Sequence, residues 1–244
     1  MSQQRVAVVT GASRGIGRQI ALTLASRGSA VVVGYAGRED AAAQVVREVT
    51  EAGGRAVAVQ ADIADEKAVA ALFDAAEAEF GGVDVVVNSA GRMVLGPIAE
   101  FDLDDLDSMH RTNIRGTFVV LREAVRRVRD GGAVVTLSTS ILGLQFPAYA
   151  AYAASKGAVE AMTLIAAREV RGRDITVNTV APGPTATELF LEGKDEATVE
   201  RLAKTPPLER LGTPQDIAGA VAFLAGPDGR WVNGQVLRVN GGIV

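Results

Sequence analysis

Short apolar runs rich in β-branched residues alternate with amphipathic stretches along the chain of 244 residues. Brief apolar runs bounded by glycine or polar residues are typical of strands that are buried on both faces. Stretches with apolar residues three and four positions apart are typical of helices that cover a sheet. This alternation predicts parallel strands, because each connection between them has to cross over through a helix. We therefore predict an α/β fold of the Rossmann type, a doubly wound parallel sheet with right-handed crossovers.

Seven strands and six helices account for most of the sequence. The strands are expected at residues 6–10, 30–33, 56–59, 83–88, 133–137, 175–180 and 235–239. The helices are expected at residues 15–27, 39–52, 65–80, 102–129, 150–170 and 214–225. No internal repeat or linker interrupts the pattern, so residues 1–244 are predicted to form a single domain.

One stretch of the chain fits neither pattern. Residues 182–212 are rich in Pro, Gly, Thr and Glu and lie between the sixth predicted strand and the last predicted helix. In doubly wound sheets, ligands bind beyond the carboxyl ends of the strands, and this stretch leaves such an end. We therefore interpret it as a lid over a substrate site, with an ordinary surface loop as the alternative.

Several classes of function are excluded by the composition. The chain has no Cys and a single His, His110, so disulfides, thiol catalysis and Cys-ligated or His-pair metal sites are ruled out, and no metal site is predicted. A formal net charge of −4 argues against nucleic acid and anionic membranes as partners. No apolar run approaches the roughly 18 residues of a membrane helix. The first residues do not resemble a signal peptide, so a cytoplasmic protein is expected.

A glycine-rich loop follows the first predicted strand. Residues 11–17 read Gly-Ala-Ser-Arg-Gly-Ile-Gly and lead directly into a predicted helix. Free N–H groups and the dipole at such a helix start favour a negatively charged pyrophosphate. The spacing G-x-x-x-G-x-G is not the G-x-G-x-x-G of many dinucleotide sites, and no Lys-Ser/Thr follows as in a P-loop. At the first strand of an alternating fold, the loop nevertheless favours a dinucleotide over a chance turn.

The end of the second predicted strand indicates which dinucleotide binds. NAD sites usually carry an acidic residue there that accepts a hydrogen bond from the ribose 2′-hydroxyl. Here residues 34–38 read Gly-Tyr-Ala-Gly-Arg, and the first acid is Glu39. Arg14 and Arg38 instead offer guanidinium groups that suit a 2′-phosphate, the alternative being that both are solvated surface arginines. We therefore predict NADP(H) rather than NAD as the cofactor.

Tyr152 and Lys156 lie four positions apart near the start of a predicted helix, and therefore on one helix face. A phenol titrates at about pH 10, so it transfers protons poorly at neutral pH unless a neighbouring cation stabilises the phenolate. The pair is a candidate proton donor to a substrate oxygen, or acceptor from it. The alternative is an amphipathic pair with Tyr152 in the core. Residues 138–140, Ser-Thr-Ser, end the preceding strand and offer hydroxyls that polarise a carbonyl or cap the strand.

Together these motifs resemble the short-chain dehydrogenase/reductase family, and the resemblance covers essentially the whole chain. Residues 10–17 look like its T-G-x-x-x-G-x-G cofactor loop, and residues 152–156 look like its Y-x-x-x-K active-site pair. Residues 88–91, Asn-Ser-Ala-Gly, look like its N-N-A-G turn with a serine in place of the second asparagine. Residues 182–183 resemble its Pro-Gly turn, and the tail 233–242 resembles its closing strand.

The resemblance implies roles for individual residues. Asp62 would hydrogen-bond the adenine, and Asn113 would hold a water molecule of a proton relay. Cofactor contacts are implied at Gly11, Ser13, Arg14, Gly15, Ile16, Gly17, Tyr35, Ala36, Gly37, Arg38, Asp62, Ile63, Asn88, Ala90, Gly91, Tyr152, Lys156, Pro182, Gly183, Thr185 and Thr187. The implied catalytic residues are Asn113, Ser140, Tyr152 and Lys156. The family's usual spacing of thirteen residues before Tyr152 selects Thr139, whereas its S-x-x-G pattern selects Ser140. We choose Ser140 and keep Thr139 as the alternative.

The function implied by the resemblance is NADPH-dependent reduction of a ketone or oxoacyl carbonyl to an alcohol. Tyr152 would give its proton to the forming alkoxide, Lys156 would lower the Tyr152 pKa and bind the ribose, and Ser140 would orient the carbonyl. Members that act like 3-oxoacyl-carrier-protein reductase or hydroxynaphthalene reductase look most similar. An NAD-linked alcohol, polyol or hydroxysteroid dehydrogenase and a non-catalytic NADP-binding protein are the alternatives.

Two further expectations concern the substrate pocket and the assembly. Residues 140–149 and 185–205 should build the pocket. The side chains that should make it apolar are Leu142, Leu144, Phe146, Tyr149, Leu189 and Phe190. The predicted helices 102–129 and 150–170 carry more apolar residues than one sheet face needs. In the family these helices pair across a two-fold axis and the closing strand forms a second interface, so the resemblance implies a homotetramer.

Overall fold

The computed structural model describes residues 4–244 as strands that alternate with helices. The strands are β1 (Val6–Thr10), β2 (Ala30–Tyr35), β3 (Ala56–Gln60), β4 (Val83–Asn88), β5 (Val128–Leu137), β6 (Thr176–Pro182) and β7 (Val236–Val239). The helices are α1 (Gly15–Ser26), α2 (Glu39–Glu51), α3 (Glu66–Phe80), α4 (Leu103–His110), α5 (Thr117–Arg127), α6 (Ile141–Leu144), α7 (Ala150–Glu169), α8 (Glu188–Leu191), α9 (Glu196–Ala203) and α10 (Pro214–Ala225). There are also 3₁₀ turns at Ile98–Glu100 and Pro227–Gly229 and a π-helical turn at Arg111–Gly116.

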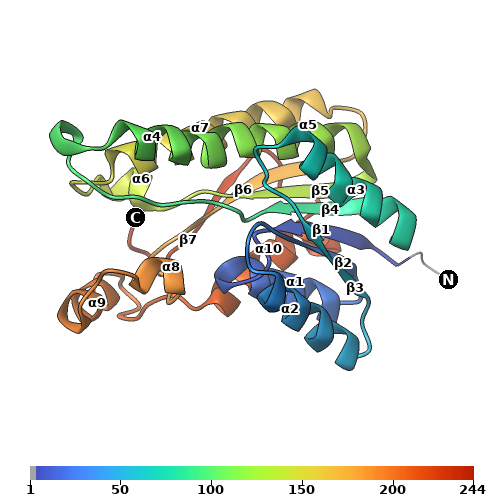
Figure 1. Ribbon diagram of the computed structural model, residues 1–244, viewed down its shortest axis with the longest axis horizontal. Helices are drawn as coiled ribbons and strands as arrows, with labels where there is room; N and C mark the ends of the chain where they lie inside the picture. The colour runs from blue at the N-terminus through green and yellow to red at the C-terminus, as the bar shows by residue number, and fades with distance from the viewer. Residues whose placement is uncertain (1–3) are drawn as a thin grey trace.

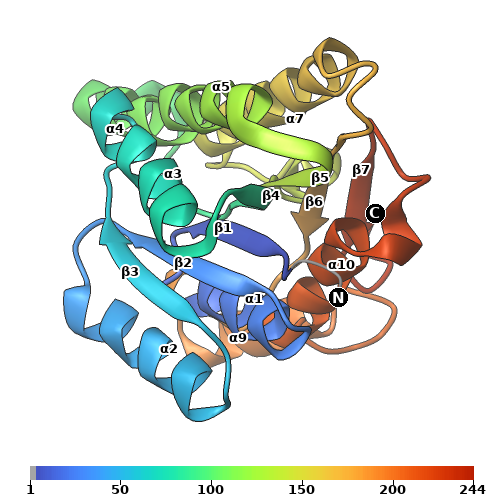
Figure 2. The same cartoon turned by 90° about the vertical axis from the view of Figure 1, so that its right-hand side faces the viewer.

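The strands form one parallel sheet in the order β3-β2-β1-β4-β5-β6-β7, which confirms the predicted Rossmann-type fold. Helices α1, α2 and α10 cover one face, and α3, α4, α5 and α7 cover the other (Figures 1 and 2). The chain builds outward from β1 to β3, crosses back to β4 and then builds outward to β7. This reversal opens a crevice at the carboxyl ends of β1 and β4. The ends are level there, because Thr10 pairs with Asn88 and Asn88 pairs with Thr136.

Burial of the strands on both faces explains their unbroken valine runs. In β1, Val6 and Val8 pack into the cluster that includes α3, α5 and α7 side chains. The neighbouring Ala7 and Val9 pack into the opposite cluster, with side chains of α1, α2 and α10. Burying a valine side chain fully contributes roughly 1.5–3 kcal/mol relative to leaving it exposed. The hydrophobic effect therefore fixes the central strands, and with them the crevice at their carboxyl ends.

The long predicted helix 102–129 is divided in the structure. Asp102 caps the start of α4, as the prediction of a helix beginning there requires. The run then widens into the π-helical turn Arg111–Gly116 before α5 continues it. The Thr117 hydroxyl donates a hydrogen bond to the Asn113 carbonyl at 2.6 Å, and so takes part in the bonding of this turn. The turn lies next to the crevice, so its irregular backbone is part of the candidate site.

Strand β5 begins at Val128, earlier than the predicted range 133–137. Val128 pairs with Val83 of β4 and Ala133 pairs with Val85, so residues 129–132 bulge from the ladder between these two pairs. Helices α6 and α8, of four residues each, and α9, of eight, were not predicted, because they are too short to show a helical period. None of the helices within residues 4–244 has the length and apolarity of a membrane span.

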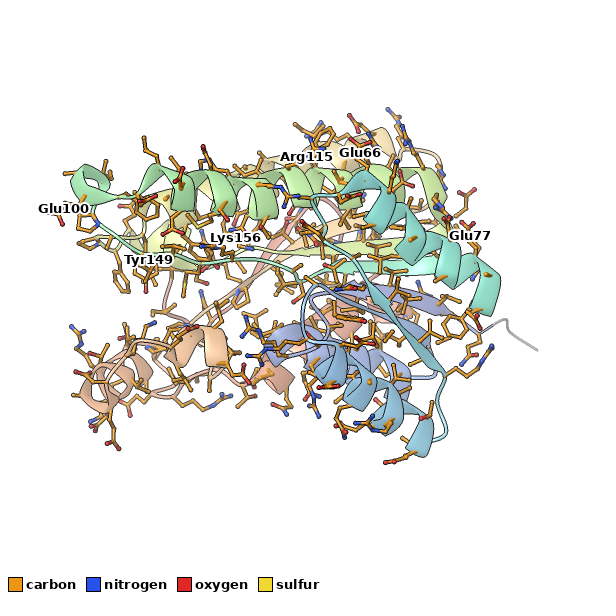
Figure 3. All side chains as sticks on the ribbon, viewed as in Figure 1. Glu66, Glu77, Glu100, Arg115, Tyr149 and Lys156 are labelled. Atoms are coloured by element: carbon orange, nitrogen blue, oxygen red, sulfur yellow. The ribbon has the colours of Figure 1, made fainter. Side chains whose placement is uncertain are left out.

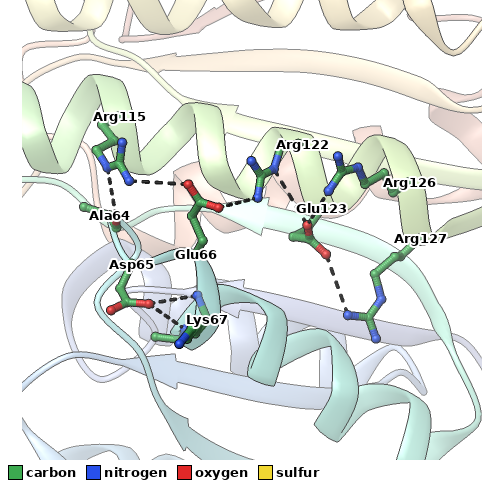
Figure 4. A network of polar contacts seen from close by, with 10 residues as sticks. Ala64, Asp65, Glu66, Lys67, Arg115, Arg122, Glu123, Arg126 and Arg127 are labelled. Atoms are coloured by element: carbon green, nitrogen blue, oxygen red, sulfur yellow. Dashed lines mark hydrogen bonds and ion pairs between the residues drawn. The ribbon is translucent and has the colours of Figure 1, made fainter.

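A network of ion pairs joins the start of α3 to α5 (Figure 4). Glu66, the first residue of α3, lies 2.8 Å from Arg122 and 3.5 Å from Arg115. The side chain of Glu123 is almost buried and lies 3.3 Å from Arg126. This network orients α3 against α5. Because exposed ion pairs contribute only about 0–1 kcal/mol each, it adds little to the free energy of unfolding.

Candidate active site

A cavity of about 650 Å³ lies at the carboxyl ends of the strands. A volume of this size is typical of a site for a cofactor or another small molecule. Its walls come from the segments that follow β1 to β6, so the topology alone gathers them at one edge of the sheet. The predicted site residues that line it are Gly11, Ser13, Arg14, Gly15, Ile16, Gly17, Ala36, Gly37, Arg38, Asp62, Ile63, Ala90, Gly91, Ser140, Tyr152, Lys156, Pro182, Gly183, Thr185 and Thr187.

Three predicted site residues, Tyr35, Asn88 and Asn113, are buried and do not line the cavity. Asn88 accepts a hydrogen bond from the Thr10 hydroxyl at 2.6 Å and donates one to the Thr117 hydroxyl at 2.9 Å. These bonds tie β1, β4 and α5 together beneath the crevice. Asn88 therefore supports the floor of the cavity.

Asn113 lies in the π-helical turn with its amide fully hydrogen-bonded. Its Nδ2 atom donates to the Arg92 carbonyl at 2.8 Å and to the Ser155 hydroxyl at 2.9 Å, and its Oδ1 atom accepts from the Arg92 N–H at 2.8 Å. A Cβ atom on Gly91 would lie 3.4 Å from both Asn113 Oδ1 and Lys156 Nζ. Because Gly91 has no side chain, the Asn113 amide and the Lys156 ammonium can both lie close to the backbone that follows β4. Asn113 fixes that chain next to the ammonium group.

The glycine loop fits the pyrophosphate of a dinucleotide. Gly11 has a φ of 64°, which favours glycine, and a Cβ atom there would lie 2.8 Å from the Ala90 backbone. A Cβ atom on Gly17 would lie 2.2 Å from the Gly11 carbonyl oxygen. Side chains at these positions would therefore fill the turn. The start of α1 has no side-chain cap, so its first N–H groups are left for an anion.

Two arginines place positive charge at the rim of the cavity. Arg14 follows β1, Arg38 follows β2, and their side chains are 43% and 53% exposed. Residues 34–37 carry no acid, so the end of β2 itself supplies no carboxylate to accept from a ribose hydroxyl. This charge pattern suits a phosphate on the ribose, as the prediction of NADP(H) requires.

Asp62 lines the cavity after β3. Its carboxylate accepts hydrogen bonds from the Ala64 N–H at 2.9 Å and from the Arg111 guanidinium at 2.7 Å. Burial alone would raise the pKa of this carboxyl, but the two hydrogen bonds and the charge of Arg111 hold it below its usual value. Asp62 is therefore an ionised acceptor at neutral pH.

Tyr152 and Lys156 lie on the same face of α7 and line the cavity, as their spacing predicts. The buried Lys156 ammonium donates a hydrogen bond to the Leu137 carbonyl at 2.8 Å and lies 5.9 Å from the centre of the Tyr152 ring. Figure 3 shows Lys156 and Tyr149 on the side of the α7 layer that faces the sheet. The carboxyl end of β5 thus holds the ammonium beside the phenol.

Burial dominates the titration of both groups. It lowers the pKa of Lys156 to about 8. It raises the pKa of Tyr152 to about 12, against which a hydrogen bond with Thr139 acts. In the protein alone, burial is the largest influence on the Tyr152 pKa, so the lowering of that pKa by Lys156 stays a prediction for the complex with cofactor. At neutral pH the phenol keeps its proton and most of the ammonium is charged.

Two hydroxyls at the end of β5 have different partners. Ser140 donates a hydrogen bond to the Ala181 carbonyl at 3.0 Å and accepts one from the Asn240 amide at 2.9 Å. Thr139 instead accepts a hydrogen bond from the Ile141 N–H at 3.3 Å, and its hydroxyl acts to lower the pKa of the Tyr152 phenol. Both hydroxyls line the cavity. The Ser140 hydroxyl donates its proton within the protein, whereas that of Thr139 accepts there, so the two candidates differ in their partners.

Apolar side chains form one wall of the cavity. Leu144, Phe146, Tyr149, Leu189 and Phe190 line it as predicted, whereas Leu142 does not. Glu188 and Leu202 line the cavity from the predicted range 185–205, whereas the lining residues that the sequence analysis missed include Ser89, Arg92, Met93, Arg111 and Thr112. Position alone could have suggested Arg92 and Met93, because they follow directly on the Asn-Ser-Ala-Gly turn.

Proteins of known sequence and structure resemble this chain over almost its full length. A family model described as enoyl-(acyl carrier protein) reductase matches residues 11–244. A short-chain type dehydrogenase/reductase of Picea abies is 47% identical over 250 residues, which cover 98% of this chain and 92% of that protein. A protein of Arabidopsis thaliana named NADPH-dependent aldehyde reductase-like protein, chloroplastic, is 43% identical over 256 residues, which cover 98% and 94%.

Solved structures agree with the sequence relatives. A short chain dehydrogenase from Burkholderia cenocepacia in complex with NADP has a TM-score of 0.93 and 37% identity to this chain, over 99% of this chain and 98% of that one. The matched region contains the glycine loop, the Tyr152–Lys156 pair and the segment after β6. The resemblance drawn from the motifs is thereby confirmed, and the chain belongs to the short-chain dehydrogenase/reductase family.

Proposed function

We propose that the protein is an NADP(H)-dependent oxidoreductase that reduces a ketone or oxoacyl carbonyl to an alcohol. One observation carries the proposal: the glycine loop, the two rim arginines, Tyr152 and Lys156 all line the same cavity, beside an apolar wall. A hydride carrier and a carbonyl compound can therefore meet next to a proton donor. The relative named for NADPH-dependent aldehyde reduction and the related structure in complex with NADP support this choice of cofactor.

The residues present fit NADP(H) along the cavity. The N–H groups at the start of α1 would hold the pyrophosphate, and Arg14 and Arg38 would hold the 2′-phosphate. Asp62 would accept a hydrogen bond from the adenine, and Lys156 would bind ribose hydroxyls. When bound, NADPH supplies a hydride to the carbonyl carbon.

Tyr152 is the proposed proton donor to the carbonyl oxygen as that oxygen becomes an alkoxide. Because burial raises its pKa to about 12, the phenol is protonated at neutral pH and ready to donate. The positive charge of Lys156 stabilises the phenolate that remains after the transfer. Oxidation of an alcohol would use the same residues in reverse, with the phenolate as the proton acceptor.

Thr139, rather than Ser140, is the proposed hydroxyl that polarises the carbonyl. A hydroxyl assists only if it reaches the same oxygen that Tyr152 protonates. The Thr139 hydroxyl accepts from the Ile141 N–H at 3.3 Å, which leaves its proton for a substrate oxygen, whereas the Ser140 hydroxyl donates its proton to the Ala181 carbonyl and accepts from the Asn240 amide. Ser140 would then hold the end of β5 against the end of β6 and the tail.

Thr139→Ala should lower kcat/KM for carbonyl reduction by about tenfold or more, because a positioned donor to the developing oxyanion is lost. Thr139→Ser keeps the hydroxyl and should retain most of the rate. Ser140→Ala should leave kcat within about threefold of the wild-type value and lower the free energy of unfolding by about 1 kcal/mol. Steady-state kinetics and urea unfolding measure both effects. A larger rate loss in Ser140→Ala than in Thr139→Ala would return the role to Ser140.

Two other functions fit the site less well. An NAD-linked alcohol, polyol or hydroxysteroid dehydrogenase would be favoured by an acid at the end of β2, and residues 34–37 carry none. A non-catalytic NADP-binding protein would not need a phenol and a buried ammonium in one cavity, yet Tyr152 and Lys156 both line it. A reductase therefore accounts for more of the residues that line the cavity than either alternative does.

A substrate screen that follows NADPH absorbance tests the proposed activity. Diketones, quinones, oxoacyl thioesters and aryl ketones sample the carbonyl classes that an apolar wall admits. NADPH oxidation that depends on one of these compounds is expected. Tight NADPH binding without turnover of any class would instead favour the non-catalytic alternative. Tight NADH binding with oxidation of alcohols would favour the dehydrogenase.

A homotetramer is proposed as the assembly. Phe118 on α5 and Ile165 on α7 are 58% and 57% exposed, although both helices pack against the sheet with their other faces. Exposed large apolar side chains on adjacent helices are typical of surfaces that are covered in an oligomer. Trp231, near the closing strand β7, is 98% exposed and lies where a second interface would form.

Light scattering at micromolar concentration should give a mass of about 101 kDa, four times the chain mass of 25.3 kDa. The physical reason is that symmetric closed assemblies bury apolar faces such as that of α5 and α7. A mass near 25 kDa would contradict the assembly, and a mass near 51 kDa would leave one interface only.

The stretch between β6 and α10 is proposed as the substrate lid. Leu189, Phe190 and Leu202 from this stretch line the cavity. Its short helices α8 and α9 would therefore cover a bound substrate with apolar side chains. A cytoplasmic location stays a prediction, since the Arabidopsis thaliana relative is named as chloroplastic.

A further inference from the structure

A carboxylate on the proposed lid already occupies the two rim arginines. Glu188 is the first residue of α8, and its Oε2 atom lies 2.9 Å from Arg38 Nη1 and 3.3 Å from Arg14 Nη1. The two guanidinium groups come from the ends of different strands and would repel each other without an anion between them. One carboxylate oxygen bridges them, as an oxygen of a phosphate would.

These ion pairs are the polar attachment of residues 188–205, the part of the lid that includes α8 and α9, to the rest of the protein. Within residues 4–244, the hydrogen bonds and ion pairs of the stretch 188–205 are otherwise made with itself and with Thr187. Thr187 and Asp195, for example, only cap the short helices that follow them. Loss of the Glu188 contacts would leave apolar packing alone to hold this stretch over the cavity.

We propose that Glu188 is a latch on the lid that the 2′-phosphate of NADP(H) displaces. The inference rests on the proposed role of Arg14 and Arg38 in holding that phosphate. A phosphate carries more charge than a carboxylate and forms strong hydrogen bonds with guanidinium groups, so it replaces Glu188 when it is present.

Displacement of Glu188 frees the first turn of α8. Leu189 and Phe190 in this turn line the cavity, so the nucleotide end becomes coupled to the proposed substrate wall. NADP(H) releases that wall, whereas NAD(H), which lacks the phosphate, leaves it latched. Glu188 thus lowers the affinity for the phosphate and, in exchange, makes lid mobility depend on the correct cofactor.

Calorimetric titration of the full-length protein with nucleotide fragments tests the competition without any turnover. Glu188→Gln should bind 2′,5′-ADP about three- to tenfold more tightly than the wild type, a modest gain because the two ion pairs it removes are exposed. Binding of 5′-AMP should not change. Glu192→Gln removes the same charge from an exposed lid residue without an ion-pair partner among the described residues, and it should bind both fragments like the wild type.

Hydrogen exchange of the amides in α8 and α9 tests the release of the lid. In the wild type, saturating 2′,5′-ADP should speed exchange there and 5′-AMP should not. In Glu188→Gln, exchange should be fast already without a nucleotide and should not respond to either fragment. The Glu192→Gln variant should behave like the wild type.

The Arg38→Ala variant separates failure of the latch from failure of the phosphate site. If Arg38→Ala weakens 2′,5′-ADP binding but Glu188→Gln leaves affinity and lid exchange unchanged, the latch is overturned and the phosphate site stands. If neither Arg38→Ala nor Arg14→Ala changes the affinity for 2′,5′-ADP, the proposed phosphate site is wrong, and the latch is wrong with it. A gain in affinity that is equal for 2′,5′-ADP and 5′-AMP would likewise overturn the latch.

Discussion

Tyr152→Phe is expected to lower kcat for carbonyl reduction by at least about 10²-fold, the lower range for loss of a general acid. The substitution keeps the ring and its packing but deletes the hydroxyl that is proposed to protonate the carbonyl oxygen. Thr139 and Lys156 remain beside the ring, but the Thr139 hydroxyl is a much weaker acid and Lys156 donates to the Leu137 carbonyl. NADPH affinity, measured by fluorescence titration, should stay within about threefold of wild type.

Tyr149→Phe is the matched comparison for that variant. Tyr149 also lines the cavity and loses the same atom, but its ring packs edge-on against Phe146 at a centroid distance of 6.2 Å. A wall residue contributes to substrate binding, so its loss should change KM more than kcat. A Tyr152→Phe enzyme that keeps a third or more of its kcat would refute Tyr152 as the proton donor. Equal losses of kcat in both variants would point to disturbed packing of the wall.

The strands could be predicted because their determinants are local. The valines of β1 face two different apolar clusters on alternate sides, and such burial leaves an unbroken apolar run in the sequence. The start of β5 could not be predicted in this way. Residues 129–132, Arg-Asp-Gly-Gly, look like a turn, and they have no partner in β4: Val128 pairs with Val83 and Ala133 with Val85, and Gly131 has a φ of 81°. Only the tertiary pairing of Val128 extends the strand to the far side of this turn, and local propensity does not report it.

The candidate site was predictable where a motif carries its own geometry. Four-residue spacing on a helix places Tyr152 and Lys156 on one face whatever surrounds them. The direction in which the Tyr152 pKa shifts depends on how deeply the phenol is buried in the cavity. The spacing of residues in the sequence does not reveal that burial. The choice between Thr139 and Ser140 depends on partners from β6 and the tail, Ala181 and Asn240.

The ion pairs of Glu188 could not have been predicted from any sequence motif. Its ion-pair partners, Arg38 and Arg14, lie 150 and 174 positions away in the sequence. The glycine loop and the end of β2 therefore indicate where a phosphate would bind, but not which side chain holds that place in the protein alone. Only the fold, which brings the start of α8 to the ends of β1 and β2, shows that Glu188 pairs with these two arginines.

Arg38→Asp is expected to lower the preference for NADPH over NADH by about 10²-fold, equivalent to about 2.7 kcal/mol. The wild-type protein should bind NADPH at least about tenfold more tightly than NADH. The substitution removes one of two guanidinium groups from the proposed 2′-phosphate site. It also places a carboxylate after β2, where NAD sites carry an acid for the ribose 2′-hydroxyl. Repulsion of the phosphate and recognition of the hydroxyl should act in the same direction.

Fluorescence titration with each nucleotide separates these two contributions. Weaker NADPH binding with unchanged NADH binding would mean that Arg38 only attracts the phosphate, and stronger NADH binding would mean that the new carboxylate also accepts from the ribose. Arg47→Asp makes the same charge change on the exposed side of α2, away from the cavity lining, and should leave the preference near the wild-type value. An unchanged preference in Arg38→Asp would show that the 2′-phosphate binds elsewhere, because a charge reversal beside a phosphate cannot be silent.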